Sequence, residues 1–163
     1  NPPVAPVPVS FAMLLTLAGV ANTEDPAVLW GFISRYLPGA TPESSPRLAA
    51  LVAHAIAYYR DFVKPRKAYR APGPAERAAL EELLAWLRRQ PEGASAEALQ
   101  HEIYEIGKRH GFANLRDWFK GLYEVLLGQS EGPRMGSFFA LFGLENSCRL
   151  IETALAGRLD AAA

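Results

Sequence analysis

Apolar residues recur along this chain at the spacing of helix faces, and residues that start or stop helices separate the runs. One clear stripe holds Leu115, Trp118, Phe119, Leu122 and Leu126. Capping residues mark the starts and glycines mark the ends: Ser10, Asp25, Ser45, Ser95 and Asn114, then Gly111, Gly128 and Gly143. Alanine and leucine far outnumber the β-branched residues, and no Asn-Gly or Asp-Gly hairpin turn occurs. The sequence therefore predicts an all-α fold.

These signals predict about eight helices, with uncertain boundaries. Their expected ranges are 10–21, 25–37, 46–63, 74–90, 95–110, 114–127, 134–142 and 145–158. The segment 69–76 contains two prolines and a glycine, which interrupt helices. We therefore place a boundary there between two packed helical subdomains. The first, residues 1–70, would hold a proline-rich connector and about three helices, and the second would be residues 71–163.

Composition and charge exclude several classes of protein. The net charge is zero, which argues against a chain uniformly coated in basic residues. Residues 1–70 hold seven Lys or Arg against four Asp or Glu, and residues 71–163 hold ten against thirteen. The apolar run at 11–20 is shorter than the roughly 20 residues that span a bilayer, and a single cysteine forms no internal disulfide. We expect a cytoplasmic protein without membrane contact, in which any anion site is local.

No constellation of residues predicts a catalytic or metal centre. His54, His101 and His110 lie far apart in the sequence, and only His101 has a carboxylate beside it. Residues 128–132, Gly-Gln-Ser-Glu-Gly, match the pattern around a hydrolase nucleophile, but that pattern requires a strand running into the serine. Because a helix is expected to precede it, Ser130 is interpreted as a turn residue. We predict no catalytic residue, metal or cofactor in this chain.

A basic and aromatic stretch at residues 58–70 gives the strongest functional signal. Its cations alternate with aromatic residues: Arg60, Lys64, Arg66, Lys67 and Arg70 with Tyr58, Tyr59, Phe62 and Tyr69. Cations neutralise phosphates and exposed rings stack on unpaired bases, a combination typical of single-stranded RNA recognition. In the alternative, the cations offset a helix dipole while Tyr59, Phe62 and Val63 lie in the core. The sequence leaves both interpretations open.

Two further basic clusters lie at predicted helix ends. The first surrounds a corner between two helices and comprises Lys108, Arg109, His110, Arg116 and Lys120. Trp118 and Phe119, which follow the same corner, share the apolar stripe and are assigned mainly to packing. The second cluster places Arg134 and Ser137 in the first turn of a short helix, where backbone N–H groups and a guanidinium could bind phosphate together. An ordinary helix start is the alternative there.

Longer motifs lie at residues 22–33, 58–65, 106–128 and 131–138. The third begins Ile-Gly-Lys-Arg-His-Gly-Phe and ends Tyr-Glu-Val-Leu-Leu-Gly, and the fourth is Glu-Gly-Pro-Arg-Met-Gly-Ser-Phe. In sequence and in order, these motifs resemble the C-terminal region of class I lysyl-tRNA synthetases. The Leu-Leu-Gly, Gly-Pro and Leu-Phe-Gly sequences are also similar to those of glutamyl-tRNA synthetases. The resemblance implies a helical, cage-like anticodon-binding domain that binds lysine tRNA at its anticodon loop.

The resemblance also implies where the chemistry of such an enzyme takes place. Activation of lysine with ATP and magnesium belongs to an N-terminal catalytic domain, and neither short ATP signature of class I synthetases occurs in these 163 residues. We therefore expect a tRNA-binding fragment whose parent enzyme attaches lysine to its tRNA. The implied contacts to phosphate or base come from residues inside the motifs: Lys108, Arg109, His110, Arg116, Lys120 and Arg134, with Phe138 as a stacking ring.

A protein-interaction or assembly module without RNA binding is the alternative from another functional class. In that alternative, the stretch at 58–70 would meet an acidic partner helix, and the neutral net charge is compatible with it. A continuous basic surface joining residues 60–70 to residues 108–120 would favour RNA. Scattered charge would favour a protein partner.

Overall fold

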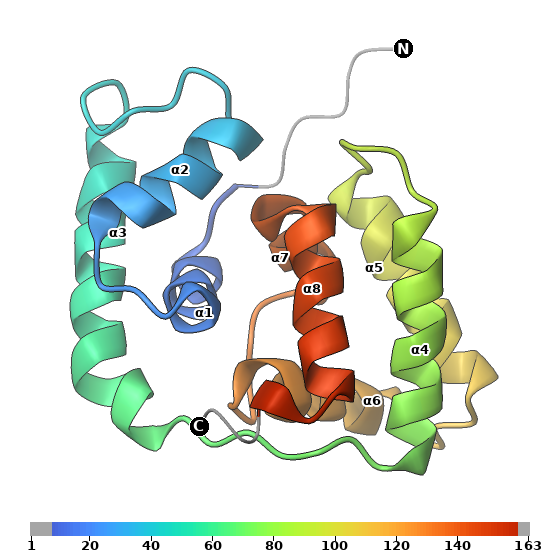
Figure 1. Cartoon of the computed structure of the whole chain (residues 1–163). Helices are drawn as coiled ribbons and strands as arrows, with labels where there is room; N and C mark the ends of the chain where they lie inside the picture. Colours follow the sequence, from blue (N-terminus) through green and yellow to red (C-terminus); the bar gives the residue numbers. More distant parts are fainter. Residues whose placement is uncertain (1–7, 160–163) are drawn as a thin grey trace.

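The computed structural model describes residues 8–159, and this part of the chain contains eight α-helices and no strand (Figure 1). The helices are α1 (Phe11–Ala21), α2 (Pro26–Tyr36), α3 (Pro46–Tyr58), α4 (Pro74–Arg88), α5 (Ala96–Arg109), α6 (Leu115–Leu122), α7 (Met135–Phe142) and α8 (Leu144–Leu155). The predicted all-α fold is confirmed. Residues 1–7 of the predicted connector and residues 160–163 lie outside the described residues.

Three short helical turns continue the regular helices. The five-residue π-helical turn η1 (Tyr59–Val63) extends α3 and is followed by the 3₁₀ turn η2 (Lys64–Arg66). A second π-helical turn, η3 (Tyr123–Leu127), extends α6 and ends at Gly128, whose φ of 71° is left-handed. Together with these turns, the helices cover almost the same ranges as those predicted from the sequence.

The predicted capping residues explain where most helices begin. The side chains of Ser10, Asp25, Ser95 and Asn114 each accept a hydrogen bond from a backbone N–H in the first turn of α1, α2, α5 and α6. Ser45 precedes α3 as predicted, but its side chain makes no capping hydrogen bond. Proline at the start of α3 therefore marks that helix without help from the serine hydroxyl.

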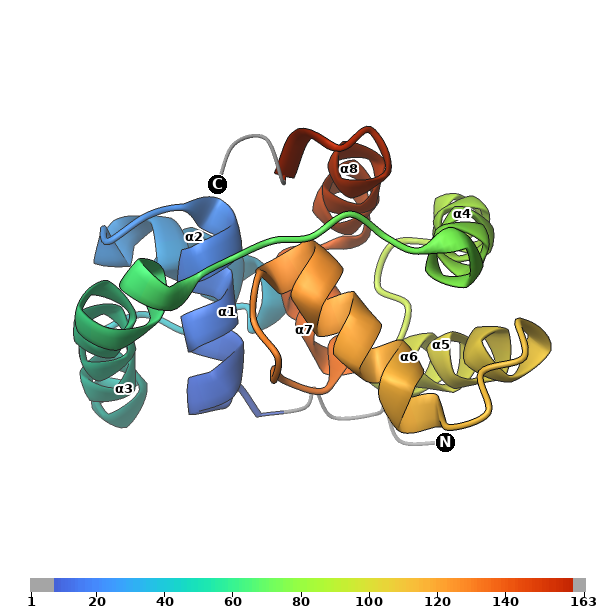
Figure 2. The ribbon, with the colours of Figure 1, turned by 90° about the horizontal axis from the view of Figure 1, so that it is seen from below.

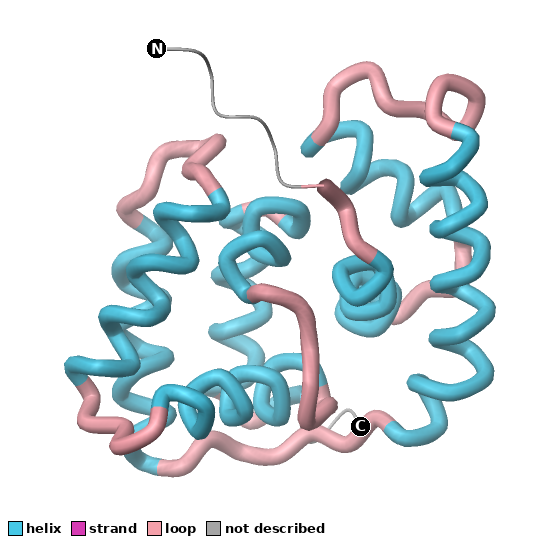
Figure 3. Tube along the Cα trace, turned by 180° about the vertical axis from the view of Figure 1, so that it is seen from behind, coloured by secondary structure: helices cyan, strands magenta, loops and turns pink. Residues whose placement is uncertain are grey.

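The helices form two groups joined by an extended segment. Figure 1 shows α1, α2 and α3 on one side and α4, α5, α6 and α8 on the other, and Figure 3 shows the loop at 67–73 running along one edge between them. From below, this segment crosses the molecule in front of α1 (Figure 2). The Ala68 N–H donates to the Gly128 carbonyl at 2.9 Å, so the segment is fixed to the end of η3.

The α7 helix connects the two groups because its neighbours come from both. It packs against α5 and α8 and also against α1 and α2. Seven of its eight residues are buried, and one continuous hydrophobic cluster runs from α1 to α8. The predicted subdomain boundary at 69–76 lies in the extended segment and at the start of α4, whereas the hydrophobic core is continuous between the two groups of helices. The division into two subdomains stays a prediction.

Glycine permits the closest helix contact in the molecule. A Cβ atom at Gly136 of α7 would lie 2.5 Å from the Ala96 carbonyl oxygen and 2.5 Å from the Gln100 nitrogen of α5. The Gly136 N–H donates to Gln100 Oε1 at 2.7 Å at the same place. Any larger residue would push the backbones of α5 and α7 apart.

The α6 helix divides sharply into a buried side and an exposed side. Trp118 is fully buried, and its Nε1–H donates to the Ile103 carbonyl of α5 at 2.9 Å. The ring packs where Gly107 has no side chain, since a Cβ there would lie 2.4 Å from Trp118. Leu122, one turn later, is 1% exposed. The predicted apolar stripe is confirmed at these two positions, and it leaves the opposite side of α6 to solvent.

Candidate nucleic-acid interface

The basic and aromatic stretch at 58–70 holds its cations in contacts with the rest of the chain. Arg60 Nε lies 3.0 Å from Asp61 Oδ1, and the Lys64 ammonium lies 3.6 Å from Glu24 Oε2. The hydrogen bond between Arg60 and Asp61 lowers the pKa of that carboxyl. Both pairs are well exposed, so they contribute little to stability, but they reduce the positive potential offered to a phosphate.

Lys67 is a structural residue within this stretch. Its Nζ donates to the Gly19 carbonyl at the end of α1 at 2.9 Å, and it lies 5.7 Å and 5.5 Å from the ring centres of Tyr59 and Tyr69. Burial, followed by the nearby charge of Lys64, lowers the pKa of the Lys67 ammonium. The side chain therefore ties α1 to the extended segment and turns inward rather than toward a ligand.

Arg70 is bound on two sides by carboxylates. Its guanidinium meets Glu76 at 2.7 Å and Glu124 of η3 at 3.0 Å. Hydrogen bonds to these carboxylates raise the pKa of Arg70, Glu76 first, and the same bond to Arg70 lowers the pKa of Glu76 despite its partial burial. Glu76 also accepts the Gly73 N–H at 2.8 Å, which completes the start of α4. Arg70 therefore holds the extended segment in place.

Arg66 is exposed and, unlike Arg60, Lys64 and Arg70, forms no ion pair with any described residue. The rings around it are divided between core and solvent. Tyr59 is buried as the core interpretation predicts, but Phe62 is 56% exposed, so its assignment to the core is wrong. Tyr58 and Phe62 lie 5.0 Å apart on the surface and continue a row of rings through Phe11. The stretch therefore exposes both rings and cations to solvent.

The cluster at 108–110 is also compensated by acidic residues. Arg109 bonds Glu102 at 2.6 Å and also Glu82 of α4, whose other oxygen lies 2.9 Å from His110 Nε2. Lys108 pairs with Glu105 at 3.0 Å. The bond to Arg109, followed by the bond to His110, lowers the pKa of Glu82. In the sequence only His101 has a carboxylate beside it, but in the structure Glu82 reaches His110 from another helix.

Three of the predicted cations remain uncompensated on neighbouring elements. Arg116 and Lys120 lie one helical turn apart on the exposed side of α6, and Arg134 immediately precedes α7. None of the three forms an ion pair with a residue between 8 and 159. The Tyr123 hydroxyl donates to the Pro133 carbonyl at 3.0 Å, which fixes the loop before Arg134 to the end of α6. We call these three residues the α6–α7 cations.

Two predicted contacts on α7 are corrected by the structure. Phe138 is fully buried and stacks on Phe142 with ring centres 5.3 Å apart, so it cannot stack on a base. Ser137 is 2% exposed, and its hydroxyl has no hydrogen-bond partner, so it cannot reach a surface phosphate. The reason is that helices from both groups surround α7. Of the second predicted cluster, only Arg134 reaches solvent.

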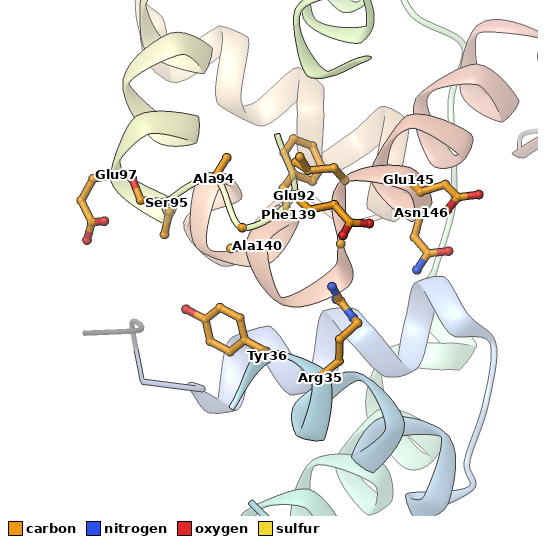
Figure 4. A pocket seen from close by; sticks show the side chains of 14 residues that line it. Arg35, Tyr36, Glu92, Ala94, Ser95, Glu97, Phe139, Ala140, Glu145 and Asn146 are labelled. Atoms are coloured by element: carbon orange, nitrogen blue, oxygen red, sulfur yellow. The ribbon is translucent and has the colours of Figure 1, made fainter. Parts of the chain in front are cut away.

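A cleft that the sequence did not predict opens at the other end of α7. It has a volume of about 750 Å³, and α2, the start of α5 and the corner between α7 and α8 form its walls. Figure 4 shows Arg35 of α2 on one side of the cleft and Glu92, Glu145 and Asn146 on the other. Gly143, whose φ is 94°, lies in that corner. This glycine was the one signal for the corner in the sequence, and it was interpreted only as a helix end.

The described residues offer neither a metal site nor a membrane span. Between residues 8 and 159, no group of three or more His, Cys, Asp or Glu side chains converges so as to hold a metal ion. No helix in the same range is long and apolar enough to cross a bilayer. Ser130 lies in the loop after η3, as its interpretation as a turn residue requires, and no strand leads into it.

Several proteins that are similar to this chain are lysine–tRNA ligases. No family model matches the chain. A lysine–tRNA ligase of Rickettsia bellii is 49% identical over 147 residues, which are 90% of this chain and 28% of that protein. The chain resembles one segment of the lysine–tRNA ligases. A lysine–tRNA ligase of Roseobacter denitrificans is 48% identical over 96% of the chain and 30% of that protein, and one of Rickettsia felis is 48% identical over 88% and 27%.

The resemblance predicted from the sequence is therefore confirmed at the level of the lysine–tRNA ligases. The chain spans less than a third of the length of these relatives. The similarity covers all eight helices in extent of chain, with 157 residues aligned in the longest of these matches. The function of this segment within such a protein depends on the groups that its surface exposes.

Proposed function

We propose that this chain is a tRNA-binding region of a lysine–tRNA ligase, and that the α6–α7 cations hold the backbone of the anticodon loop. The observation that carries the proposal is the contrast in pairing. Six of the basic residues predicted to bind RNA lie beside carboxylates of the same chain: Arg60, Lys64, Arg70, Lys108, Arg109 and His110. Arg116, Lys120 and Arg134 form no ion pair with a described residue, whereas only Arg66 is both exposed and unpaired in the stretch at 58–70. Exposed, uncompensated cations are the groups that displace counterions from phosphates.

The mechanism would be binding and positioning rather than catalysis. In a lysine–tRNA ligase, attachment of lysine to tRNA with ATP and magnesium would take place in a part of the protein that this chain does not match. Contacts to phosphate orient an RNA without recognising its sequence. Specificity for the lysine anticodon would then come from base contacts nearby, and the acceptor end would be directed to a distant active site.

The experiment that tests the proposal is fluorescence anisotropy with a labelled anticodon stem-loop of lysine tRNA. A stem-loop with a scrambled anticodon is titrated beside it, at two salt concentrations. We expect preference for the lysine anticodon and weaker binding at the higher salt concentration. Equal, strongly salt-dependent affinity for both RNAs would leave only a nonspecific phosphate surface. No binding to either RNA would contradict the proposal.

A protein-interaction module is the second candidate, and one observation favours it. Tyr58 and Phe62 are 41% and 56% exposed, and the neighbouring Arg60 and Lys64 are already paired. A surface of exposed rings with compensated charge is more typical of a protein interface than of a phosphate-binding one. If Phe62→Ser leaves both the fold and the affinity for RNA unchanged, this surface is separate from the RNA site.

A further inference from the structure

The cleft beside Arg35 has the size and chemistry of a ligand site. Its volume of about 750 Å³ lies within the range that small-molecule sites occupy. Both polar and apolar side chains line it: Arg35, Glu92, Glu145 and Asn146, and also Ala140 and Leu144. Such a mixture of apolar walls and a few polar groups is typical of sites for small organic ligands.

Arg35 is held in position while most of its donors are unused. Its Nη2 donates to the Leu141 carbonyl at 2.6 Å. The guanidinium lies against Gly143, where a Cβ atom would come within 2.9 Å of Nη2 and 3.1 Å of Nη1. Among the described residues, its side chain makes no other hydrogen bond and no ion pair. A guanidinium has five N–H donors, so several remain for a ligand.

The charges around the cleft select against two kinds of ligand. Glu92, Glu97 and Glu145 line the cleft together with Arg35, and these carboxylates outnumber the arginine and would repel a phosphate, although Glu145 is also paired with Arg149. A bare cation fits no better, because no three acidic or histidine side chains between residues 8 and 159 converge on one point. The site instead suits a neutral group that carries both acceptors for Arg35 and donors for the carboxylates.

We propose that this cleft receives one unpaired nucleobase of the bound RNA, with the Arg35 guanidinium donating to acceptors on the base edge. This inference rests on the proposed function. Unstacked bases of RNA loops are recognised by hydrogen bonds to their edges, and arginine is well matched to their paired acceptors. Glu145 and Asn146, across the cleft, each contact Arg149 and keep further lone pairs on their side-chain oxygens, which can accept from base amino or imino groups.

The cleft and the α6–α7 cations lie at opposite ends of the same helix. Arg134 immediately precedes α7, and Phe139, Ala140 and Gly143 of the cleft lie at its end. Eight helical residues extend about 12 Å. Phosphate contacts at one end and a base contact at the other can therefore engage the same loop of RNA, which separates positioning from recognition.

The test combines protein variants with stem-loops that lack one base. Each anticodon nucleotide of the lysine stem-loop is replaced in turn by an abasic one, and affinities are measured by anisotropy. We expect one replacement to weaken binding to the wild-type protein by about tenfold. Arg35→Ala should weaken binding to the intact stem-loop by about tenfold and show no further loss on that abasic one.

Two further variants make the test independent of folding and of simple charge. Arg35→Lys keeps the charge and a donor for Leu141 but removes the planar fork, so it should lose affinity as Arg35→Ala does. Arg47→Ala is the matched control, because Arg47 is an exposed arginine of α3 without an ion pair among the described residues. Thermal unfolding of each variant shows whether the fold is intact.

The outcomes separate this inference from the proposed function. If the wild-type protein binds no stem-loop, the proposed function fails. If it binds but both Arg35 variants match Arg47→Ala, RNA binding stands and the base pocket is overturned. Loss of affinity that is additive with every abasic position would also overturn it, because a base held by Arg35 predicts coupling at one position only.

Discussion

Two basic regions of this chain have different surroundings. In residues 58–70, Arg60, Lys64 and Arg70 each have a carboxylate partner and Lys67 is bonded to a backbone carbonyl, which leaves only Arg66 exposed without an ion pair among the described residues. On α6 and before α7, the α6–α7 cations have no such partner within residues 8–159. The number of cations in a segment therefore does not determine its electrostatic potential. The acidic residues that the fold brings beside these cations determine it.

The largest effect is expected from the buried side of α6, which holds Arg116 and Lys120 in place. Leu122→Ala should lower the free energy of unfolding by about 2–5 kcal/mol, because it opens a cavity in the core. Urea denaturation followed by circular dichroism measures the change. An unchanged midpoint would mean that α6 is not anchored by this side.

The next effect concerns the difference in RNA affinity between the unpaired and the paired cations. Arg116→Ala, Lys120→Ala and Arg134→Ala combined should weaken binding of the stem-loop by about ten- to a hundredfold and reduce the slope of log K against log salt by about 2. The matched control is Arg60→Ala with Lys64→Ala, which removes paired cations and should change affinity by less than about threefold. Equal losses in the two variants would remove the distinction between the segments.

A smaller effect tests the structural role of the first segment. Arg70→Ala should lower the free energy of unfolding by about 1 kcal/mol, discounted for the exposure of the arginine, because it leaves Glu76 and Glu124 without their partner. Affinity for the stem-loop should stay within about twofold of wild type. A large loss of affinity without loss of stability would place Arg70 in the RNA site instead.

The smallest effect is the pH dependence that the same cluster produces. Its bond to Arg70 lowers the pKa of Glu76 in the folded chain, so this stabilisation is present above the unfolded pKa of about 4.3 and is lost as pH falls through the folded value. Glu76→Gln should therefore flatten the decline of unfolding free energy below about pH 5. An unaltered decline would show that other carboxylates cause it.

Most of the fold follows from local signals in the sequence. Ser10, Asp25, Ser95 and Asn114 begin helices through contacts within one turn, which the sequence contains in full. The error at Phe62 has a local cause. The π-helical turn η1 adds a residue to the turn and rotates the following positions away from the α-helical stripe. Helical periodicity alone therefore predicted a buried ring that is exposed.

The candidate site was less predictable because it depends on distant residues. Glu82 and Arg109 are 27 residues apart, and Arg70 and Glu124 are 54 apart. No spacing rule connects such pairs, so the sequence could not show which cations are compensated. Phe138 was assigned as a stacking ring from the family resemblance, and no local signal in the sequence shows that α7 lies among helices of both groups.

The close crossing at Gly136 has a consequence for the entropy of binding. Because the backbones of α5 and α7 meet without an intervening side chain, the two helices cannot shift relative to each other without losing that contact. The distance between Arg134 and the cleft is therefore fixed in the free protein. A site fixed in this way loses little conformational freedom when it is occupied, so more of the contact energy is retained as affinity.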